Sequence, residues 1–398
     1  MRLRALRTVA VGLSAGTLAA SVAGCAVRAQ AAQVTGRAAV VSPAGARAAA
    51  AGWRVVAAMG NAALAGGLSA SGTNNAWLSE AICAGKCTDP TDLTGRQLRW
   101  NGTAWRSVTL PGAYAGGIVV PASPASNWIV GSVLVSEKAD RDVVLHWTGK
   151  GTGKTTLLGR TVSIATGVAP AAQQAWLFGA SASGGPDGSP YALHYAGGTW
   201  RPVKVPFAGE GASASSPANV WVSGYLPSDD EAGVMAFNGK RWRPVPLPPL
   251  PSSLTYSSSG SIAAASPSNV WLEIDRGADS LGPTPYLLHW TGSKWTSIKI
   301  PYHLDDMGAA PIAQDGRGGV WLSLGDTSDP AHALVFLLHY LNGRWTRIAV
   351  PAGAGSAVPG AVELTWIPGT RSLWGAVAEL NAKSPKSPGK LLLLTYGP

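Results

Sequence analysis

Residues Ser266 to Pro301 read SPSNVWLEIDRGADSLGPTPYLLHWTGSKWTSIKIP and contain the unit from which the rest of the chain is built. Short runs of β-branched and aromatic residues between Gly and Pro predict three strands, at 269–273, 286–290 and 295–300. A Thr291-Gly292-Ser293-Lys294 turn joins the last two strands, and its Gly supplies the positive φ that a tight hairpin requires. The stretch therefore predicts a β-fold.

The first Trp of this unit recurs along the chain. It is found as Trp77, Trp128, Trp176, Trp221, Trp271, Trp321 and Trp374, at intervals of 45 to 53 residues. Each copy contains a second aromatic residue just before a Gly or a Gly turn: Trp100, Trp147, Tyr195, Phe237, Trp290, Tyr340 and Tyr396. Such a period is typical of repeat folds. A run of small residues before each Trp predicts a further strand crowded against a central axis, so each copy is expected to be one propeller blade.

The two ends of the chain predict how the ring closes. The seventh copy stops at Tyr396-Gly397-Pro398 and lacks a fourth strand, whereas Trp53-Arg54-Val55-Val56 matches the missing strand. Closure removes sheet edges that would otherwise pair with other chains. We therefore predict an all-β, seven-bladed β-propeller over residues 53–398, with four antiparallel strands per blade and the last blade closed by the N-terminal strand.

The first 52 residues predict export. Three Arg precede an apolar run that ends at Val22, which is typical of a signal peptide over residues 1–24. Val22-Ala23-Gly24-Cys25 resembles the lipobox of bacterial lipoproteins, so lipidation of Cys25 and anchoring on the outer face of a bacterial cell membrane are expected. Residues 25–52 then form an Ala-rich flexible tether. An ordinary secretory signal with a chance Cys is the alternative, and the protein would then be secreted.

Cysteine usage agrees with export. If Cys25 is lipidated, Cys83 and Cys87 remain as an even pair in an oxidising compartment, which predicts a disulfide. A metal site is the alternative for a pair at this spacing, but no second pair and no His lie nearby.

The predicted propeller has a nearly balanced charge. The chain has 31 Lys and Arg against 21 Asp and Glu, and the first 50 residues hold six Arg and no acid. The remainder is therefore 25 against 21, or a net charge of +4. This balance does not predict a nucleic-acid surface, and no nucleic-acid-binding motif is present.

Two features that suggest chemistry are better explained by the fold. The stretch from Gly149 to Thr156 resembles a phosphate loop but has Thr148 where the motif needs Gly, and no helix pattern follows it. Four His occupy one repeat position, which predicts imidazoles buried beside aromatic rings rather than a metal ring: His146, His194, His289 and His339. Asp315-Gly316 precedes Trp321 in a turn expected to be structural. We predict no catalytic residues, metal or cofactor.

The connections between the second and third strands are long and variable, and they are expected to emerge together on one face. Several carry acidic residues, which form the candidate binding face: Asp140, Asp142, Asp187, Asp229, Asp230, Glu231, Asp275, Asp279, Asp326 and Asp329. The tight turns of the opposite face carry cations: Lys150, Lys154, Lys240, Arg241, Lys294 and Arg344. Binding sites are commonly placed on loops of a rigid scaffold, although such charges also keep loops soluble.

The Ser-Pro-x-Asn-Val-Trp sequences that end at Trp221 and Trp271, followed by Leu-His-Trp-x-Gly and Trp, resemble the Trp-repeat propellers of secreted actinobacterial and myxobacterial proteins. That resemblance covers residues 53–398 and implies an architecture similar to kelch, galactose-oxidase or sialidase propellers. Neither a sialidase Asp-box with its arginine cluster nor a galactose-oxidase copper set is present. The resemblance is therefore specific for fold and weak for function.

Taken together, these features predict a non-catalytic, monomeric recognition module that binds a protein or a cell-envelope glycan through its long-loop face. A propeller hydrolase or lyase acting on extracellular polysaccharide or glycoside is the alternative, with its site at the axial mouth of that face. A structural envelope scaffold is a third possibility.

Overall fold

The computed structural model describes residues 52–83, 93–110, 114–115, 117–136, 139–158, 162–181, 189–225, 232–250, 255–256, 260–277, 284–301, 311–326, 334–351, 357–381 and 389–397. The predicted signal peptide, Cys25 and the tether up to residue 51 lie outside these residues. Cys83 is the last residue of a strand and Cys87 lies outside the described residues, so their disulfide remains a prediction.

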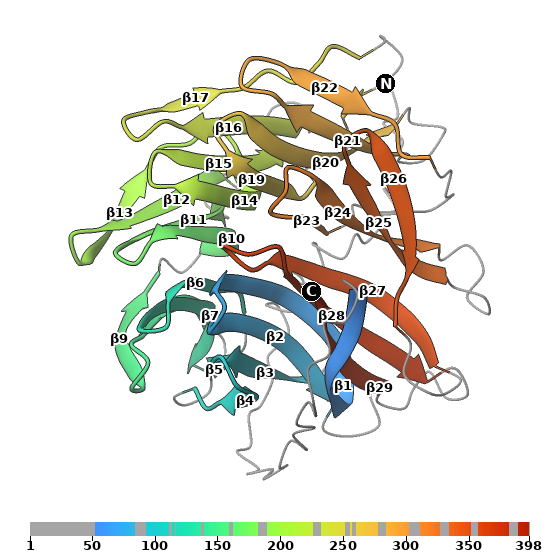
Figure 1. Ribbon diagram of the computed structural model, residues 1–398. Coiled ribbons are helices and arrows are strands. Elements are labelled where there is room, and N and C mark those ends of the chain that lie inside the picture. The colour runs from blue at the N-terminus through green and yellow to red at the C-terminus, as the bar shows by residue number, and fades with distance from the viewer. Residues whose placement is uncertain are drawn as a thin grey trace, which may run out of the picture.

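The fold is a seven-bladed β-propeller of four-stranded antiparallel blades, as predicted (Figure 1). Blades 2 to 4 consist of β6 (Val119–Ser123), β7 (Ser126–Ser136), β8 (Ala139–Trp147) and β9 (Thr152–Leu157); β10 (Val162–Ala171), β11 (Gln174–Ser181), β12 (Ser189–Ala196) and β13 (Thr199–Val203); and β14 (Ala208–Ser216), β15 (Asn219–Tyr225), β16 (Ala232–Phe237) and β17 (Trp242–Pro244). Blades 5 and 6 consist of β19 (Ile262–Ser266), β20 (Asn269–Gly277), β21 (Thr284–Trp290) and β22 (Trp295–Ile298); and β23 (Ile312–Gln314), β24 (Val320–Asp326), β25 (Leu334–Leu341) and β26 (Arg344–Ala349). Two short strands, β5 (Tyr114–Ala115) and β18 (Thr255–Tyr256), add to β7 and β20.

Blades 7 and 1 share one sheet because a single strand belongs to both. The order is β27 (Ala357–Trp366), β28 (Leu373–Asn381), β29 (Gly389–Gly397), β1 (Gly52–Gly72), β2 (Asn75–Cys83), β3 (Leu93–Trp100) and β4 (Trp105–Val108). The first half of β1 pairs with β29, with Trp53 opposite Tyr396, and the second half pairs with β2. In Figure 1 the blue and red ends of the chain accordingly lie side by side. The predicted closure by the N-terminal strand is confirmed.

The innermost strands form a ring around the axis. β1, β6, β10, β14, β19, β23 and β27 each contact the next, and β27 contacts β1. Small side chains permit this crowding, as in β19, where Ala263 and Ala264 are buried. The small-residue runs of the sequence therefore mark the axis, as predicted.

The repeated Trp of each blade packs under the aromatic residues of the next blade. Ring centroids lie 4.7 to 5.8 Å apart in every pair: Trp77–Trp147, Trp128–Tyr195, Trp176–Phe237, Trp221–Trp290, Trp271–Tyr340, Trp321–Tyr396 and Trp374–Trp100. The last pair joins blade 7 to blade 1 and completes the circle. These Trp side chains are at most 5% exposed, so the aromatic contacts form the core between blades.

The tight turns have the backbone geometry expected of them. Gly102, Gly149, Gly239 and Gly292 all have φ between 82° and 99°, the region that glycine adopts without strain. In blade 6 the turn instead begins with Asn342, at φ 51°. The stretch after Gly149 continues as strand β9, which rules out a phosphate loop because that motif needs a helix at this point.

Several strands run farther than the sequence indicated. Strand β20 continues to Gly277 rather than ending at Glu273, and β21 begins at Thr284. β8 includes Asp140 and Asp142, which had been assigned to a connection. Charged residues interrupt the apolar pattern at these points, yet the backbone ladder continues because hairpin pairing satisfies its N–H and C=O groups regardless of side chain.

Replacing Trp271 by alanine tests the contact between blades 5 and 6. Its side chain is 1% exposed, stacks on His289 and meets Tyr340. Trp271→Ala should therefore lower the free energy of unfolding by about 3–5 kcal/mol in urea denaturation. Trp271→Phe retains an aromatic ring and should cost less. A loss below about 1 kcal/mol for the alanine variant would contradict the role assigned to this ring.

Candidate functional site: the acidic layer near the long connections

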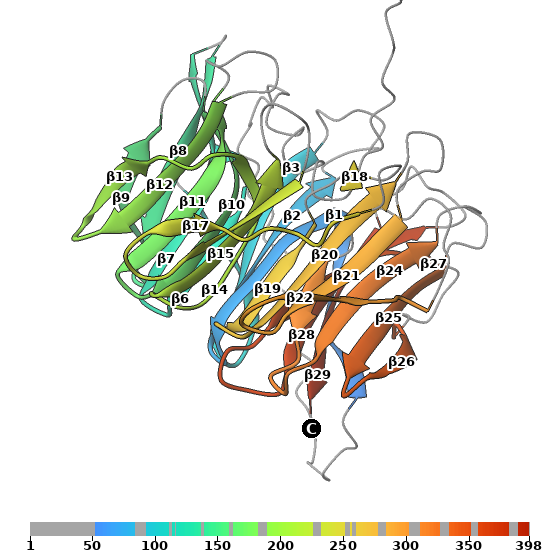
Figure 2. The same ribbon diagram turned by 90° about the horizontal axis from the view of Figure 1, so that it is seen from above.

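The strand directions give the propeller two distinct faces. We call the rim where the second and third strands of each blade are joined the long-connection face, and the opposite rim, which carries the tight turns, the short-turn face. Strand pairs such as β11 with β12 and β20 with β21 run side by side across the body between the two faces (Figure 2). The repeated Trp residues lie within the first three residues of the second strand, so the aromatic contacts occupy the short-turn half.

The four repeated His residues belong to this aromatic half. Each lies directly opposite the repeated Trp of its own blade and stacks on it, with interplanar angles of 4° to 13°: His146 on Trp128, His194 on Trp176, His289 on Trp271 and His339 on Trp321. Burial lowers the pKa of His146, His194 and His289, which favours their neutral form. The predicted placement beside aromatic rings is confirmed, although the imidazoles are half-buried rather than buried.

Three of these imidazoles are hydrogen-bonded to a polar side chain at the start of the second strand or in the turn just before it. Nε2 of His146 lies 3.0 Å from Ser126 Oγ, and Nε2 of His289 donates to Asn269 Oδ1 at 2.8 Å. In blade 1 the equivalent position holds Arg99, whose guanidinium lies 5.7 Å from the centre of the Trp77 ring. The position opposite the Trp therefore serves to cover an aromatic ring, with either imidazole or guanidinium.

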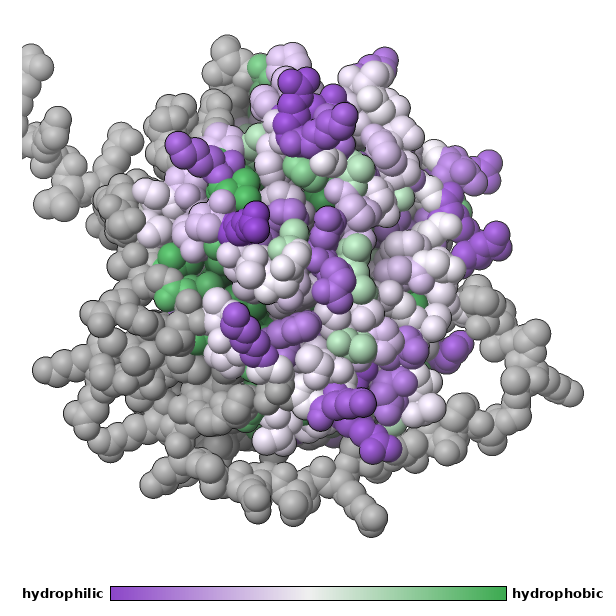
Figure 3. All heavy atoms as spheres, turned by 90° about the vertical axis from the view of Figure 1, so that its left-hand side faces the viewer, coloured by the Kyte–Doolittle hydropathy of each residue, from purple (hydrophilic) through white to green (hydrophobic). Residues whose placement is uncertain are grey.

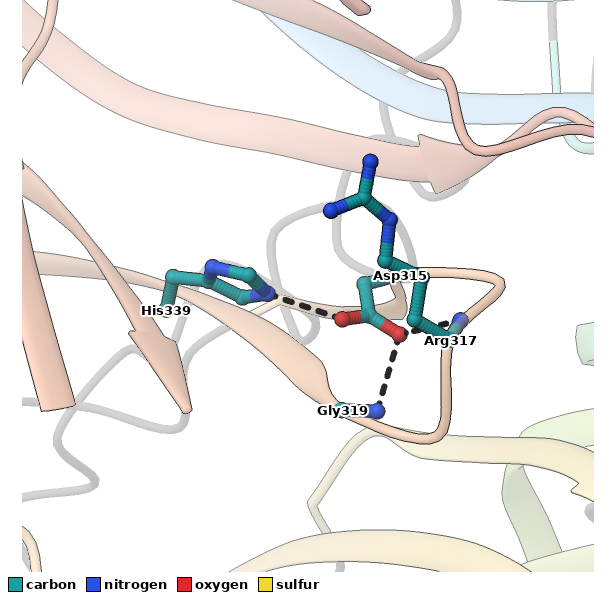
Figure 4. Close-up of polar contacts among 4 residues, drawn as sticks. All are labelled: Asp315, Arg317, Gly319 and His339. Atoms are coloured by element: carbon teal, nitrogen blue, oxygen red, sulfur yellow. Dashed lines mark hydrogen bonds and ion pairs between the residues drawn. The ribbon is translucent and has the colours of Figure 1, made fainter. Parts of the chain in front are cut away.

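Asp315 and His339 form the third example, and their arrangement resembles a catalytic pair (Figure 4). His339 Nε2 lies 2.9 Å from Asp315 Oδ2, while Asp315 Oδ1 accepts hydrogen bonds from the backbone N–H groups of Arg317 and Gly319, at 2.7 and 2.8 Å. Burial alone would raise the pKa of Asp315, but these hydrogen bonds outweigh it and lower the pKa. The carboxylate thus fixes the turn between β23 and β24, and the prediction that this Asp-Gly turn is structural is confirmed.

The long-connection half of the blades contains buried acids beside its apolar side chains. Glu80, three residues after Trp77, is 4% exposed, and Arg96 from the neighbouring strand donates to its Oε1. Burial raises the pKa of Glu80, and the hydrogen bond and charge of Arg96 lower it only in part. Glu273 and Glu379 are likewise buried, at 0% and 4% exposed. The sequence pattern does not single out these glutamates: Glu80 and Glu273 stand inside strands, and Glu379, which the pattern places at the start of a long connection, lies within β28.

Polar residues at one level of this layer join neighbouring blades. Ser79 Oγ donates to the Gly117 carbonyl, and Ser223 Oγ donates to the Gly260 carbonyl at 2.9 Å. Ser323 Oγ accepts from the Val362 N–H at 3.1 Å. Each of these serines lies two residues after its Trp and bonds to the chain that enters the next blade. Glu273 occupies the same position in blade 5.

Glu363 lies on an innermost strand, as does Glu210 of β14. Glu363 is flanked on β27 by Val362 and Leu364, which point into the core between blades 6 and 7. Because side chains alternate along a strand, Glu363 points the other way, toward the first strand of blade 1, which contacts β27. Its side chain is half-buried, and burial raises the pKa of this carboxyl to about 7. Glu363 can therefore carry or release a proton near neutral pH.

The structure describes only part of the predicted acidic binding face. Asp142 is half-buried and its Oδ2 accepts from the Ile164 N–H of the next blade at 3.1 Å, so it also joins blades. Asp275 lies within β20 and is 3% exposed, which places its carboxylate inside the layer rather than on a surface. Asp140 and Asp326 lie in strands β8 and β24. The other six lie outside the described residues: Asp187, Asp229, Asp230, Glu231, Asp279 and Asp329.

The cations of the tight turns are on the surface, as the sequence indicated. All of them are exposed: Lys150, Lys154, Lys240, Arg241, Lys294 and Arg344. The outer strands also carry exposed Arg, including Arg201 and Arg243, and Figure 3 shows hydrophilic residues spread over the side on which β9, β13 and β17 lie. Among the described residues, the buried acids therefore lie mainly near the long-connection rim, whereas exposed cations occupy the short-turn rim and also the outer strands.

Two further statements hold for the residues that the structure describes. No group of three or more His, Cys, Asp and Glu side chains in them is arranged to hold a metal ion. None of them forms a helix long and apolar enough to cross a membrane.

The Asp315 carboxylate should stabilise the fold in a pH-dependent way. Asp315→Ala removes the acceptor for two backbone N–H groups and His339, and should lower the free energy of unfolding by about 1–3 kcal/mol at pH 7. Because the pKa of Asp315 lies below its ordinary 3.8 in the folded state, this stabilisation is complete above that pH and is lost as the pH falls further. Urea unfolding at pH 7 and pH 3 should show the difference between wild type and variant shrinking at pH 3. Arg317→Ala, which leaves the backbone donor in place, is the control, and an equal difference at both pH values would contradict the assignment.

Comparison with known proteins identifies the fold without a family. No protein-family model matches the chain, and no curated protein matches its sequence. Among solved structures, a fungal alcohol oxidase of the AA5 family in complex with copper is 12% identical, with a TM-score of 0.52 over 87% of this chain and 76% of that one. The β-propeller domain of the Trilobed protease from Pyrococcus furiosus, described as having an open velcro topology, is 10% identical, with a TM-score of 0.51 over 85% and 94%.

The GH74 xyloglucanase from Xanthomonas campestris is 15% identical, with a TM-score of 0.51 over 82% of this chain and 53% of that one. These proteins include an oxidase, a protease domain and a glycan hydrolase, and at such low identities the likeness concerns the fold alone. The chain is therefore similar to propellers of several activities.

Proposed function

We propose that this protein is an exported, lipid-anchored β-propeller that recognises a protein or a cell-envelope glycan through its long-connection face, without catalysis. The observation that carries the proposal is the separation of charge between the two faces. Among the residues that the structure describes, buried acids are concentrated in the half of the body next to the long connections, whereas the tight turns carry exposed cations and no exposed acid; Lys204, Lys299 and Lys390 are exposed cations away from the tight turns. A ligand with basic or hydroxyl groups would therefore be favoured at the long-connection face.

The construction of the body supports a role as a rigid support for loops. Aromatic contacts join every blade to the next, and serine and aspartate hydrogen bonds join neighbouring blades nearer the long connections. Connections held by such a body keep fixed positions at their ends, which lowers the entropy lost on binding. The proposal assigns recognition to the connections and mechanical support to the blades.

A second candidate function is supported by Glu363. A hydrolase or lyase acting on extracellular polysaccharide would need a group near the axis that exchanges protons at neutral pH. Glu363 lies on the innermost strand, and its pKa is raised to about 7. The carboxyl could serve there as a general acid or base for a glycosidic bond placed at the axis.

Binding of the full chain to a glycan array and to delipidated cell-envelope fractions tests the recognition proposal. A variant with Asp229, Asp230 and Glu231 all changed to Ser removes three acids from one long connection and should weaken saturable binding by about tenfold or more, as expected when charge complementarity is lost. The matched control changes Lys240, Arg241 and Lys294 of the short-turn face to Ser and should bind as the wild type does. Equal weakening in both variants, or no saturable binding to any fraction, would overturn the proposal.

Glu363→Gln separates the two candidate functions. In the wild type the raised pKa of Glu363 means that the folded state holds this proton more tightly than the unfolded chain, so its stabilisation is present below about pH 4.5 and is lost as the pH rises through about 7. The variant should therefore melt at a higher temperature than the wild type at pH 8 and lose this advantage at pH 4. If the protein also turns over an envelope polysaccharide, and Glu363→Gln lowers that rate by about 100-fold or more while the fold persists, the enzymatic function is correct.

A further inference from the structure

The short-turn face carries cations on most of its blades. Besides the tight-turn residues already named, Arg317 in blade 6 and Arg371 in blade 7 lie in turns of this rim and are exposed. The side chains stand on separate turns: Lys150 in blade 2, Lys240 in blade 4, Lys294 in blade 5 and Arg344 in blade 6. The positive charge is therefore spread over the breadth of the face rather than concentrated in one pocket.

Acids do not offset this charge among the residues that the structure describes on this rim. The acid found there is Asp315, which is 3% exposed and already bonded to His339 and two backbone N–H groups. The other described acids with placed side chains lie at least two residues beyond the Trp level, toward the long connections. The face therefore presents one sign of charge to solvent.

The chain also enters the body at this face. Gly52 pairs with Gly397 and Trp53 with Tyr396, next to Leu373, which directly follows the turn between β27 and β28. Figure 2 shows the C-terminal end of β29 at the lower side of the body. The segment between Cys25 and Gly52 would thus leave from the cationic side, and a flexible tether of that length spans about 30 Å.

We propose that the short-turn face lies against a membrane surface of anionic lipid headgroups. This inference rests on the lipid anchor of the proposed function, because an anchor that holds the body within reach of the membrane raises the effective concentration of a cationic face at its surface. Dispersed lysines on separate turns fit a flat surface of many negative charges better than a single anion held in a pocket. In this orientation the long-connection face points away from the membrane, toward the ligand assigned to it.

Vesicle co-sedimentation with the mature chain from residue 25 carrying Cys25→Ser, which has neither the attached lipid nor the apolar signal segment, tests binding by the short-turn face alone. The vesicles are phosphatidylcholine alone or phosphatidylcholine with about one-third phosphatidylglycerol, a composition rich enough in anionic lipid for lysines near the surface to contribute. The protein should bind the anionic vesicles more tightly than the neutral ones, and the excess should decrease as salt is raised because the interaction is screened within about 10 Å.

Two double variants distinguish binding through the short-turn face from an effect of the protein's overall positive charge. Lys240→Ser with Lys294→Ser removes two cations from the short-turn face and should weaken binding to anionic vesicles by roughly 25-fold, or about fivefold for each residue. Lys204→Ser with Lys299→Ser removes two exposed cations that follow the outer strands of blades 3 and 5, at the ends away from the short-turn face. This variant should bind anionic vesicles almost as tightly as the unmodified protein. Thermal melting of both variants checks that the fold is retained.

Three results would overturn the inference. They are equal binding to neutral and anionic vesicles, equal losses in the two double variants, and tight binding of soluble polyphosphate without binding to anionic vesicles. The membrane inference and the recognition proposal can fail independently. The triple variant of Asp229, Asp230 and Glu231 should leave vesicle binding unchanged, whereas it should weaken binding to envelope fractions.

Discussion

The contact between the repeated Trp of one blade and the aromatic residues of the next is the interaction on which the rest of the structure depends. It fixes the angle between adjacent blades, because the indole must reach beneath a neighbouring ring at about 5 to 6 Å. Seven such angles close a circle when the last Trp meets the first blade, as Trp374 meets Trp100 and Trp105. The number of blades thus follows from one contact repeated around the axis.

This aromatic ring leaves the other half of the body open to different chemistry. The imidazoles pack on the Trp faces and the Asp315 carboxylate fixes a turn. These histidines, which resemble metal ligands in the sequence, therefore have a structural role. Nearer the long connections the blades tolerate buried carboxylates, such as Glu80 with its Arg96 partner, at a cost that the aromatic half offsets. Function is therefore expected to depend on the acidic half and the connections that leave it.

The sequence predicted the fold because each blade repeats the same signals. The Trp positions, Gly turns and unmatched strand at Trp53 define blade number and closure, and the structure confirms all three. The polar layer was not predictable in the same way. Glu80, Glu273 and Glu363 interrupt the repeat, each in one blade, and whether such a residue is buried depends on strands distant in sequence. Asp275 shows the converse, since its position near a connection suggested exposure but the ladder extends past it.

The shared strand β1 has a mechanical consequence. It is the outer strand of blade 7 and the inner strand of blade 1, and it begins at Gly52. Tension on an anchored tether would act along the length of β1, so that the hydrogen bonds from Trp53 to Ala62 resist sliding together rather than opening one after another. Slow forced unfolding is governed by the barrier to such a step. If the proposed anchor is present, the strand that closes the ring is also the one through which its load would enter, and the pairing with β29 would set how long the protein stays folded under shear.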